Sequence, residues 1–194
     1  MLRNMQTRQI QPTFEAWRDA ARTLLREGVA PQHVVWVEAG VGGLFPLAAD
    51  VPAEPAKPAN PAEHHVPPSF LQLARLVACY RDERRWALCY RLLWRLTHGQ
   101  RHVLKLATDD DVLAANRMAK AVRRDRHKMH AFVRFRKVTD DAGEHFVAWH
   151  RPDHLIVPLA APFFADRFGG MRWTILTPDA SVAWDGHALA FGPG

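Results

Sequence analysis

The fold is decided by the stretch RMAKAVRRDRHKMHAFVRFRKVTDDAGEHFVAWH, residues 117–150, where the hydrophobic period of the chain changes. Up to His130 the apolar residues recur at the 3.6-residue period of a helix, and we expect this helix to begin at about Asp110, after an acidic run that suits the positive end of a helix dipole. Beyond His130 apolar and polar residues alternate, as in a half-buried strand. The predicted hairpin consists of strands at 131–138 and 145–150 around a turn at 140–143. A helix that leads directly into a hairpin indicates an α+β fold.

Toward the N-terminus, three further segments have helical periodicity. The first is amphipathic, with Thr13 as its N-cap and Gly28 at its end. The elements predicted in this half are helices at 13–27, 69–80 and 83–98 and a strand at 33–38. Proline is concentrated over residues 46–68, where it removes backbone donors and disfavours helix. We interpret this segment as a linker or exposed loop.

Toward the C-terminus, short apolar runs alternate with turn signals. A helix is expected at 159–168, with Pro162 in its first turn. Strands are expected at 172–177, 181–184 and 188–191, the last two joined by Asp185-Gly186, a dipeptide typical of a tight hairpin. The sequence therefore predicts a single α+β domain over residues 1–194, with a helical half packed on a small, mostly antiparallel sheet.

The composition suits a folded, basic chain in a reducing compartment. With 48% hydrophobic residues the chain of 194 residues can bury a core, and its formal net charge of +6 favours anionic partners. Its two cysteines, Cys79 and Cys89, lack the CxxC spacing of a metal site and are interpreted as small core residues. No apolar run is long enough to cross a membrane, and the N-terminus lacks the apolar region of a signal peptide. We therefore expect a cytoplasmic protein.

Residues 117–137 carry nine lysines or arginines against one acid, Asp125. On a helix most of these cations share one stripe, and like charges so closely spaced repel unless an anion occupies the surface. Phosphates along a nucleic-acid backbone supply such anions, and their binding releases counterions. The predicted phosphate contacts are Arg117, Lys120, Arg123, Arg124, Arg126, Lys128, Arg134 and Arg136, with His127 and His130 as hydrogen-bond donors. The alternative is a solvated basic face with a few ion pairs.

Tryptophans beside charged residues in the strand region offer a second kind of contact, since an exposed indole can stack on an unpaired base. Trp149, Trp173 and Trp184 are the candidates, and two of them neighbour Arg151 and Arg172. The predicted nucleic-acid-binding set therefore also contains Trp149, Arg151, Arg172 and Trp173.

Asp125 falls on the predicted core stripe of the helix, which is defined by Ala114, Met118, Ala121, Val122 and Met129. A carboxylate in that position needs a partner, and one interpretation pairs it with Arg134 or Arg136. The other makes it a general base in a basic pocket, where adjacent cations keep it ionised. The two interpretations predict a structural and a catalytic role, respectively.

The histidines are weaker catalytic candidates, namely His127, His130 and His154. The spacing of His127 and His130 permits joint metal ligation, but the surrounding cations disfavour a divalent ion. The chain also lacks the GxGxxG, GxxxxGK, GxSxG and HExxH patterns of four familiar site classes. No metal site and no cofactor are therefore predicted.

With these features described, the chain resembles a bacterial family of uncharacterised DNA-metabolism proteins. The likeness is carried by YRLLWRL (90–96), MAKAVRRDRHKMHAFVRFRKV (118–138), FVAWHRPDHLIVPLAAPFFADRFGGMRWTILTPD (146–179) and AWDG (183–186). Members of this family are stand-alone proteins or N-terminal portions fused ahead of a uracil-DNA glycosylase-like (UdgX-type) domain, and they tend to be encoded beside a radical SAM protein. The resemblance implies a role in DNA repair or modification, and it supplies no catalytic residues.

The chain lacks the cysteines for the iron–sulfur cluster associated with those glycosylase domains, so we do not expect it to be that glycosylase. Its terminal AFGPG is a place where a following domain could begin, and we expect either a whole short protein or one part of a fusion.

Three functions follow. The first is a DNA-binding accessory domain of a repair or modification system. The second is an enzyme that acts on a nucleotide or damaged base. The third is a module that docks the glycosylase-like domain or the radical SAM protein through the apolar APFF segment at 161–164.

Overall fold

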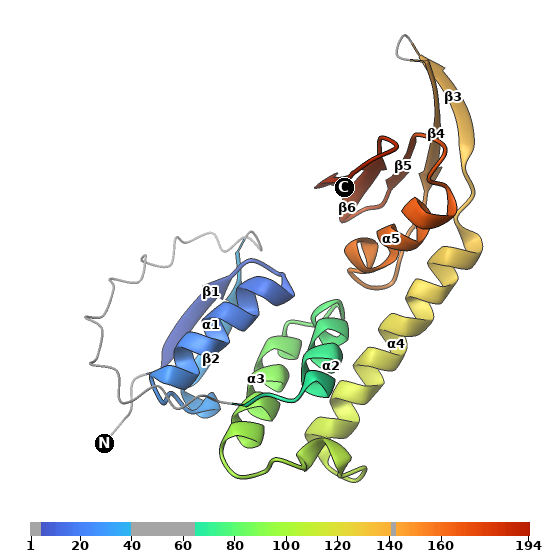
Figure 1. Cartoon of the computed structure of the whole chain (residues 1–194). Helices are drawn as coiled ribbons and strands as arrows, with labels where there is room; N and C mark the ends of the chain where they lie inside the picture. The colour runs from blue at the N-terminus through green and yellow to red at the C-terminus, as the bar shows by residue number, and fades with distance from the viewer. Residues whose placement is uncertain (1–4, 40–64, 141–142) are drawn as a thin grey trace. The chain divides into compact units, whose positions relative to one another are not determined.

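The computed structural model describes residues 5–39, 65–140 and 143–194 (Figure 1). Most of the proline-rich segment predicted at 46–68 and part of the predicted turn at 140–143 lie outside these residues. The helices are α1 Phe14–Arg26, α2 Pro68–Ala78, α3 Arg84–Thr97, α4 Asp110–Phe132 and α5 Val157–Arg167. The strands are β1 Gln6–Ile10, β2 Val34–Glu38, β3 Arg136–Asp140, β4 Gly143–Trp149, β5 Trp173–Leu176, β6 Ala180–Trp184 and β7 Leu189–Pro193. The predicted α+β class is confirmed.

The chain divides into two compact units. The first unit contains the described residues up to Ala78 together with Asp82–Ala119. The second unit contains Cys79–Arg81 and the described residues from Lys120 to the C-terminus. Helix α4 contributes its residues up to Ala119 to the first unit and the remainder to the second.

The core of the first unit is built around α1, whose apolar residues fall on one face. The predicted stripe is buried in full: Phe14, Trp17, Ala21, Leu24 and Leu25. The Oγ1 of Thr13 accepts the N–H of Ala16 at 3.2 Å, and so caps the helix as predicted. The indole of Trp17 is 1% exposed and lies 6.4 Å from the rings of both Phe70 and Trp86. These contacts join α1 to α2 and α3.

A buried ion pair also holds the first unit together. The guanidinium of Arg85 on α3 lies 2.6 Å from a carboxylate oxygen of Glu38 on β2, and the two side chains are 2% and 9% exposed. The same carboxylate accepts the indole N–H of Trp86 at 2.6 Å. Strand β2 pairs in parallel with β1, a strand that the sequence analysis did not predict.

The second unit contains a five-stranded sheet in the order β3-β4-β5-β6-β7. Three of the neighbouring pairs are antiparallel, and β4 and β5 are parallel because α5 connects them. The predicted Asp185-Gly186 turn joins β6 and β7. Asp185 accepts the N–H groups of His187 and Ala188, and Gly186 adopts a φ of +106°.

Helix α5 covers one face of this sheet. The rings of Phe164 and Trp173 lie 6.1 Å apart, and Ala148, Ile175 and Val182 are buried on the same face. On its other side α5 packs against α4, where Phe163 stacks on His130 with ring centroids 4.0 Å apart. Within the described part of the second unit, no helix packs on the opposite face of the sheet, which we call the open face (Figure 1).

Helix α4 is capped by Asp109, whose Oδ1 accepts the N–H of Val112 at 3.2 Å. The structure corrects two local predictions. Pro162 lies inside α5 and not in its first turn, which instead contains Pro158. Of the predicted core stripe of α4, only two apolar residues are fully buried, Val122 and Met129. The other buried apolar residues of this helix are Val112, Ala115 and Ala119.

Among the described residues, no helix has both the length and the apolar character needed to cross a membrane.

Candidate nucleic-acid interface

The exposed side of α4 in the second unit carries three cations, Lys120, Arg123 and Arg124, which we call the cationic face. At 3.6 residues per turn they lie within about 100° of the helix circumference, together with exposed His127. The side of α4 opposite to them carries the buried residues Val122 and Met129. The helix therefore turns its cations away from its own core. Arg117 is also exposed, on the part of α4 that belongs to the first unit.

Within the described residues, the three side chains of the cationic face make no ion pair and no hydrogen bond. The arginines of α3 differ in this respect. On α3, which the sequence also suggests as a basic surface, Arg91 lies 2.8 Å from Asp111 and Arg95 pairs with both Asp109 and Asp111. The arginines of α3 are therefore in ion pairs, whereas the three cations of the cationic face are not, although the charge of Arg124 contributes to lowering the pKa of Asp153.

Three other residues of the predicted helical set lie differently. Lys128 is 3.2 Å from the carboxylate of Asp153, so its charge is already compensated. Arg126 is half-buried beside the core. His130 stacks on Phe163 and not on the surface, and burial, with a smaller contribution from Arg126, lowers the pKa of His130. It is therefore poorly placed to donate to a phosphate.

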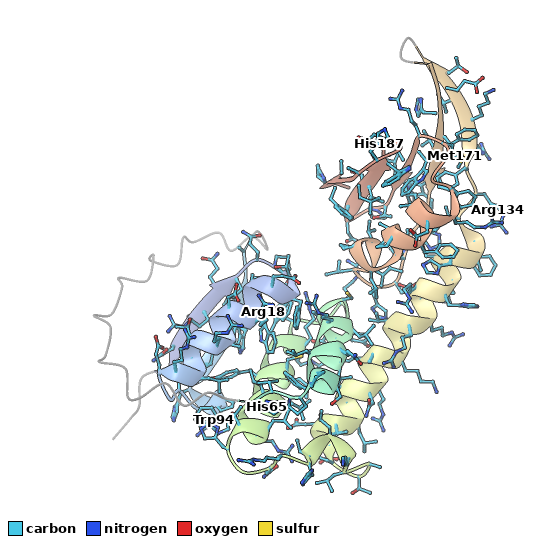
Figure 2. All side chains as sticks on the ribbon, in the orientation of Figure 1. Arg18, His65, Trp94, Arg134, Met171 and His187 are labelled. Atoms are coloured by element: carbon cyan, nitrogen blue, oxygen red, sulfur yellow. The ribbon has the colours of Figure 1, made fainter. Side chains whose placement is uncertain are left out.

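The strand residues of the predicted set belong to another surface. Arg134 donates to the carbonyl oxygens of Ala131 and Val133 at 2.7 and 3.0 Å, at the end of α4 (Figure 2). Arg136 pairs in register with Val147 and lies on the open face. Because α5 lies between α4 and the sheet, the cationic face and the open face point in different directions. The helix and strand cations therefore form two surfaces.

The three candidate stacking residues also separate. Trp149 is 65% exposed at the end of β4. Trp173 is 1% exposed and packs against Phe135 and Phe164, which leaves its indole no free face for a base. Trp184 is half-buried and donates its indole N–H to the carbonyl of Gly169. Only Trp149 of the three presents an open ring.

Asp125 is 3% exposed, and its partner is a backbone group. Its Oδ2 accepts the N–H of His154 at 2.9 Å, whereas neither Arg134 nor Arg136 is bonded to it. Buried carboxylates need such partners, because burial without a hydrogen bond is costly. Asp125 thus anchors the segment 150–154, which follows β4, to helix α4.

The same segment is held from a second side by Tyr80 and Arg81, which the sequence analysis did not select. The ring of His154 lies on that of Tyr80 with centroids 4.4 Å apart. Arg81 donates from Nε to the carbonyl oxygen of Asp153 at 3.2 Å and makes two bonds, of 2.7 and 2.5 Å, to the carboxylate of Asp179. These bonds raise the pKa of Arg81 and lower that of Asp179. A partner 98 residues away in the chain leaves no local signal in the sequence.

Two histidines of this segment are partly buried. Burial lowers the pKa of His150 and of His154, although the nearby carboxylates of Asp125 and Asp153 partly oppose it. Both imidazoles are therefore held toward the neutral form. Arg81 donates its backbone N–H to the Nδ1 of His154 at 3.4 Å, which requires that nitrogen to be unprotonated.

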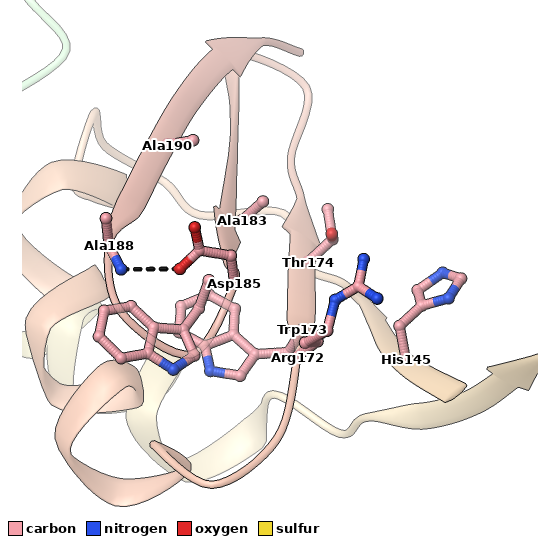
Figure 3. A pocket seen from close by; sticks show the side chains of 9 residues that line it. His145, Arg172, Trp173, Thr174, Ala183, Asp185, Ala188 and Ala190 are labelled. Atoms are coloured by element: carbon pink, nitrogen blue, oxygen red, sulfur yellow. Dashed lines mark hydrogen bonds between the residues drawn. The ribbon is translucent and has the colours of Figure 1, made fainter. Parts of the chain in front are cut away.

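A hollow of about 300 Å³ lies at the other end of the open face. Its lining consists of His145, Arg172, Trp173, Thr174, Ala183, Trp184, Asp185, Ala188 and Ala190. Three small side chains, Ala183, Ala188 and Ala190, are part of this lining (Figure 3). Asp185 accepts the N–H of Ala188 at 2.8 Å, the bond dashed in Figure 3. A cation and a carboxylate at one small hollow suit a polar ligand.

No group of three or more histidine, cysteine or acidic side chains suited to a metal ion occurs in the parts of the chain that the structure describes. Cys89 is buried, which raises the pKa of its thiol to about 12, and Cys79 is half-buried.

Comparison with known proteins identifies a family for this chain. No curated protein and no solved structure matches the chain. The model of the domain of unknown function DUF4130 matches residues 83–187, more than half of the chain, and includes the cationic face, Trp149 and Asp125. The chain belongs to the DUF4130 family.

Proposed function

We propose that this protein is a DNA-binding component of a repair or modification system and that the cationic face of α4 contacts DNA phosphates. The observation that carries the proposal is the contrast in charge pairing. Lys120, Arg123 and Arg124 are exposed and form no ion pair among the described residues, whereas Arg91 and Arg95 of α3 do.

Clustered cations of this kind repel one another, and the repulsion destabilises the isolated helix. Phosphates bound along the helix would relieve it and would release condensed counterions, which favours association. Because such contacts carry no base information, the cationic face would supply affinity and not sequence specificity. The likeness to DNA-metabolism proteins supports DNA as the polyanion, and it suggests a UdgX-type glycosylase domain or a radical SAM protein as a functional partner.

The test is fluorescence anisotropy with a labelled duplex and the matching single strand across a series of salt concentrations. The triple variant K120Q, R123Q and R124Q removes the cationic face and leaves the core untouched. If each cation neutralises one phosphate, the slope of log K against log salt should become shallower by about 2.7 on duplex and about 2.1 on single strands. At physiological salt this corresponds to an affinity loss on the order of a hundredfold.

Two further variants make the result specific to this surface. The change R18Q, R22Q and R26Q removes the same charge from α1 in the first unit and should leave the slope nearly unchanged. A second triple variant combines K128Q, in place of K120Q, with R123Q and R124Q. It should reduce the slope less than the first triple variant does, because Lys128 is already paired with Asp153. Equal effects of the α1 and α4 variants would show that net charge, and not this face, drives the binding, and the proposal would then fail.

A second candidate is an enzyme that acts on a nucleotide or damaged base. It is favoured by the convergence of Asp125, His154 and Arg81 on one segment. The geometry supports an enzyme less well than a binding protein, because the carboxylate of Asp125 and the guanidinium of Arg81 already form hydrogen bonds with the backbone of residues 153 and 154. Mass spectrometry of uracil-containing and undamaged oligonucleotides after incubation tests it. Turnover that is lost in D125N while DNA binding persists would establish it.

A further inference from the structure

The open face of the second unit's sheet is defined by the register of its strands. Val147, Thr174, Ala183 and Ala190 form one row across β4 to β7, and Trp149, Leu176, Ser181 and Gly192 form the next row. The residues between these rows point toward α5 and include Ala148, Ile175 and Val182, all at most 2% exposed. The open face therefore lies on the side of the sheet away from α5.

Two large apolar side chains lie next to each other at one end of this face. Trp149 pairs in register with Leu176, and their exposed fractions are 65% and 42%. Both are in strands whose other face is well buried, so their exposure does not come from a poorly packed region. An indole supported from one side by a leucine presents a flat surface for a planar ligand.

The charges around Trp149 indicate which ligand this is. Arg136 and Arg151 are exposed and make no ion pair among the residues that the structure describes. The carboxylates near the end of β4 have other ion-pair partners, since Asp153 pairs with Lys128 and Asp179 with Arg81, and Arg151 adds only a weaker attraction that lowers the pKa of Asp179. An exposed aromatic ring beside exposed arginines that form no ion pair favours a ligand that has both planar bases and phosphates.

The open face also continues beyond this pair. The hollow lined by His145 and Thr174 lies four residues along β4 from Trp149, or about 13 Å at about 3.3 Å per residue. A strand of nucleotides that crosses the face would meet the indole first and the hollow next. In a duplex the bases are stacked on one another, so the ring of Trp149 can act as a platform only for unpaired bases.

We propose that the open face of the β3–β7 sheet binds single-stranded DNA and that Trp149 stacks on an unpaired base. This inference rests on the proposed function and gives it a substrate class, since the cationic face alone does not distinguish single strands from duplex. Trp149 supplies the selectivity, and Arg136 and Arg151 contact the flanking phosphates.

The test compares an oligothymidylate with a duplex of the same length, using the full chain and its variants at fixed salt. W149A should weaken single-strand binding by about 5- to 150-fold, which corresponds to the 1–3 kcal/mol per stacked base seen elsewhere, and should leave duplex binding nearly unchanged. W149F should restore most of the affinity because it keeps an aromatic ring. F132A is the matched control, since Phe132 is 66% exposed at the end of α4 and not on the sheet.

Intrinsic fluorescence provides a second readout. The other six tryptophans are buried or half-buried, so the quenching caused by oligothymidylate should come mainly from Trp149 and should disappear in W149F. Unchanged single-strand affinity in W149A, or equal effects of W149A and F132A, would overturn this inference and leave the proposed function standing. A chain that binds neither form of DNA would refute both.

Discussion

Replacing Asp125 with alanine should unfold the second unit more readily, because Asp125 is the buried anchor of the segment 150–154. Its carboxylate is 3% exposed and accepts the N–H of His154 at 2.9 Å. A hydrogen bond to a charged group contributes about 1.5–3 kcal/mol, and alanine would leave a buried backbone donor without a partner. For a chain of this length each kcal/mol lowers Tm by about 2–4 °C, so D125A should lower it by roughly 3–12 °C.

The measurement combines urea unfolding with amide hydrogen exchange followed by mass spectrometry. D125A should raise exchange in residues 150–155 more than in the first unit. D125N, which keeps an acceptor oxygen, should lose less stability than D125A. The control is D166A, which removes an exposed carboxylate of α5 and should change stability by no more than about 0.5 kcal/mol. If D125A were as stable as D166A, the anchoring role of Asp125 would be refuted.

Three further predictions concern titration and the core of the first unit. Because burial lowers the pKa of His150 and His154, these histidines bind protons at a higher pH in the unfolded chain than in the folded chain. Their contribution to the free energy of unfolding should therefore be complete above about pH 7 and fall below about pH 6.5. Urea titrations at several pH values test this, and a double change to glutamine that left the pH dependence as steep as before would contradict it. R85M leaves the buried carboxylate of Glu38 uncompensated and should cost about 3–5 kcal/mol in urea unfolding, whereas E38Q/R85M should recover much of that loss; an equally unstable double variant would count against the argument. The thiol of Cys89, with a pKa of about 12, should react with a disulfide reagent at pH 8 only after unfolding, and rapid labelling of the folded protein at this position would disprove its burial.

The parts of the fold that could be predicted are those with a strong local pattern. Helix α1 carries an N-cap, a continuous apolar stripe and a terminal glycine, and all three lie where the sequence indicates. Strand β1 has the sequence QTRQI and only one buried residue, Ile10, so it gives no strand signal of its own. Strand β1 forms because the folded chain places it beside β2, and its own composition does not predict it.

The core face of α4 was misplaced by one residue because alanine dominates it. Ala114 and Ala115 are equally apolar, and only the packing of the folded helix decides that Ala115 is buried. The prediction succeeded where side chains are large, as with Met129. The position of Pro162 was mispredicted for a similar reason. A proline in the sequence shows that one backbone donor is missing, but it does not show in which turn of the helix the folded chain tolerates that loss.

The candidate site was predictable in composition but not in arrangement. The run of cations on α4 is visible in the sequence, and four of its members are exposed and form no ion pair among the described residues, namely Arg117, Lys120, Arg123 and Arg124. That Lys128 is neutralised by Asp153, and that Arg136 faces a different direction, depends on contacts between distant parts of the chain. In the folded chain Trp149 is exposed and Trp173 is buried, and no local sequence pattern predicts this difference.

The position of Tyr80 and Arg81 in the chain affects the choice of truncated fragments. These residues precede the family match at 83–187, yet Tyr80 packs on His154, and Arg81 binds Asp153 and Asp179. A fragment trimmed to the family match, or one starting at Lys120, would lose both and leave Asp179 without its guanidinium. A fragment that is to represent the second unit should therefore include residues 79–81.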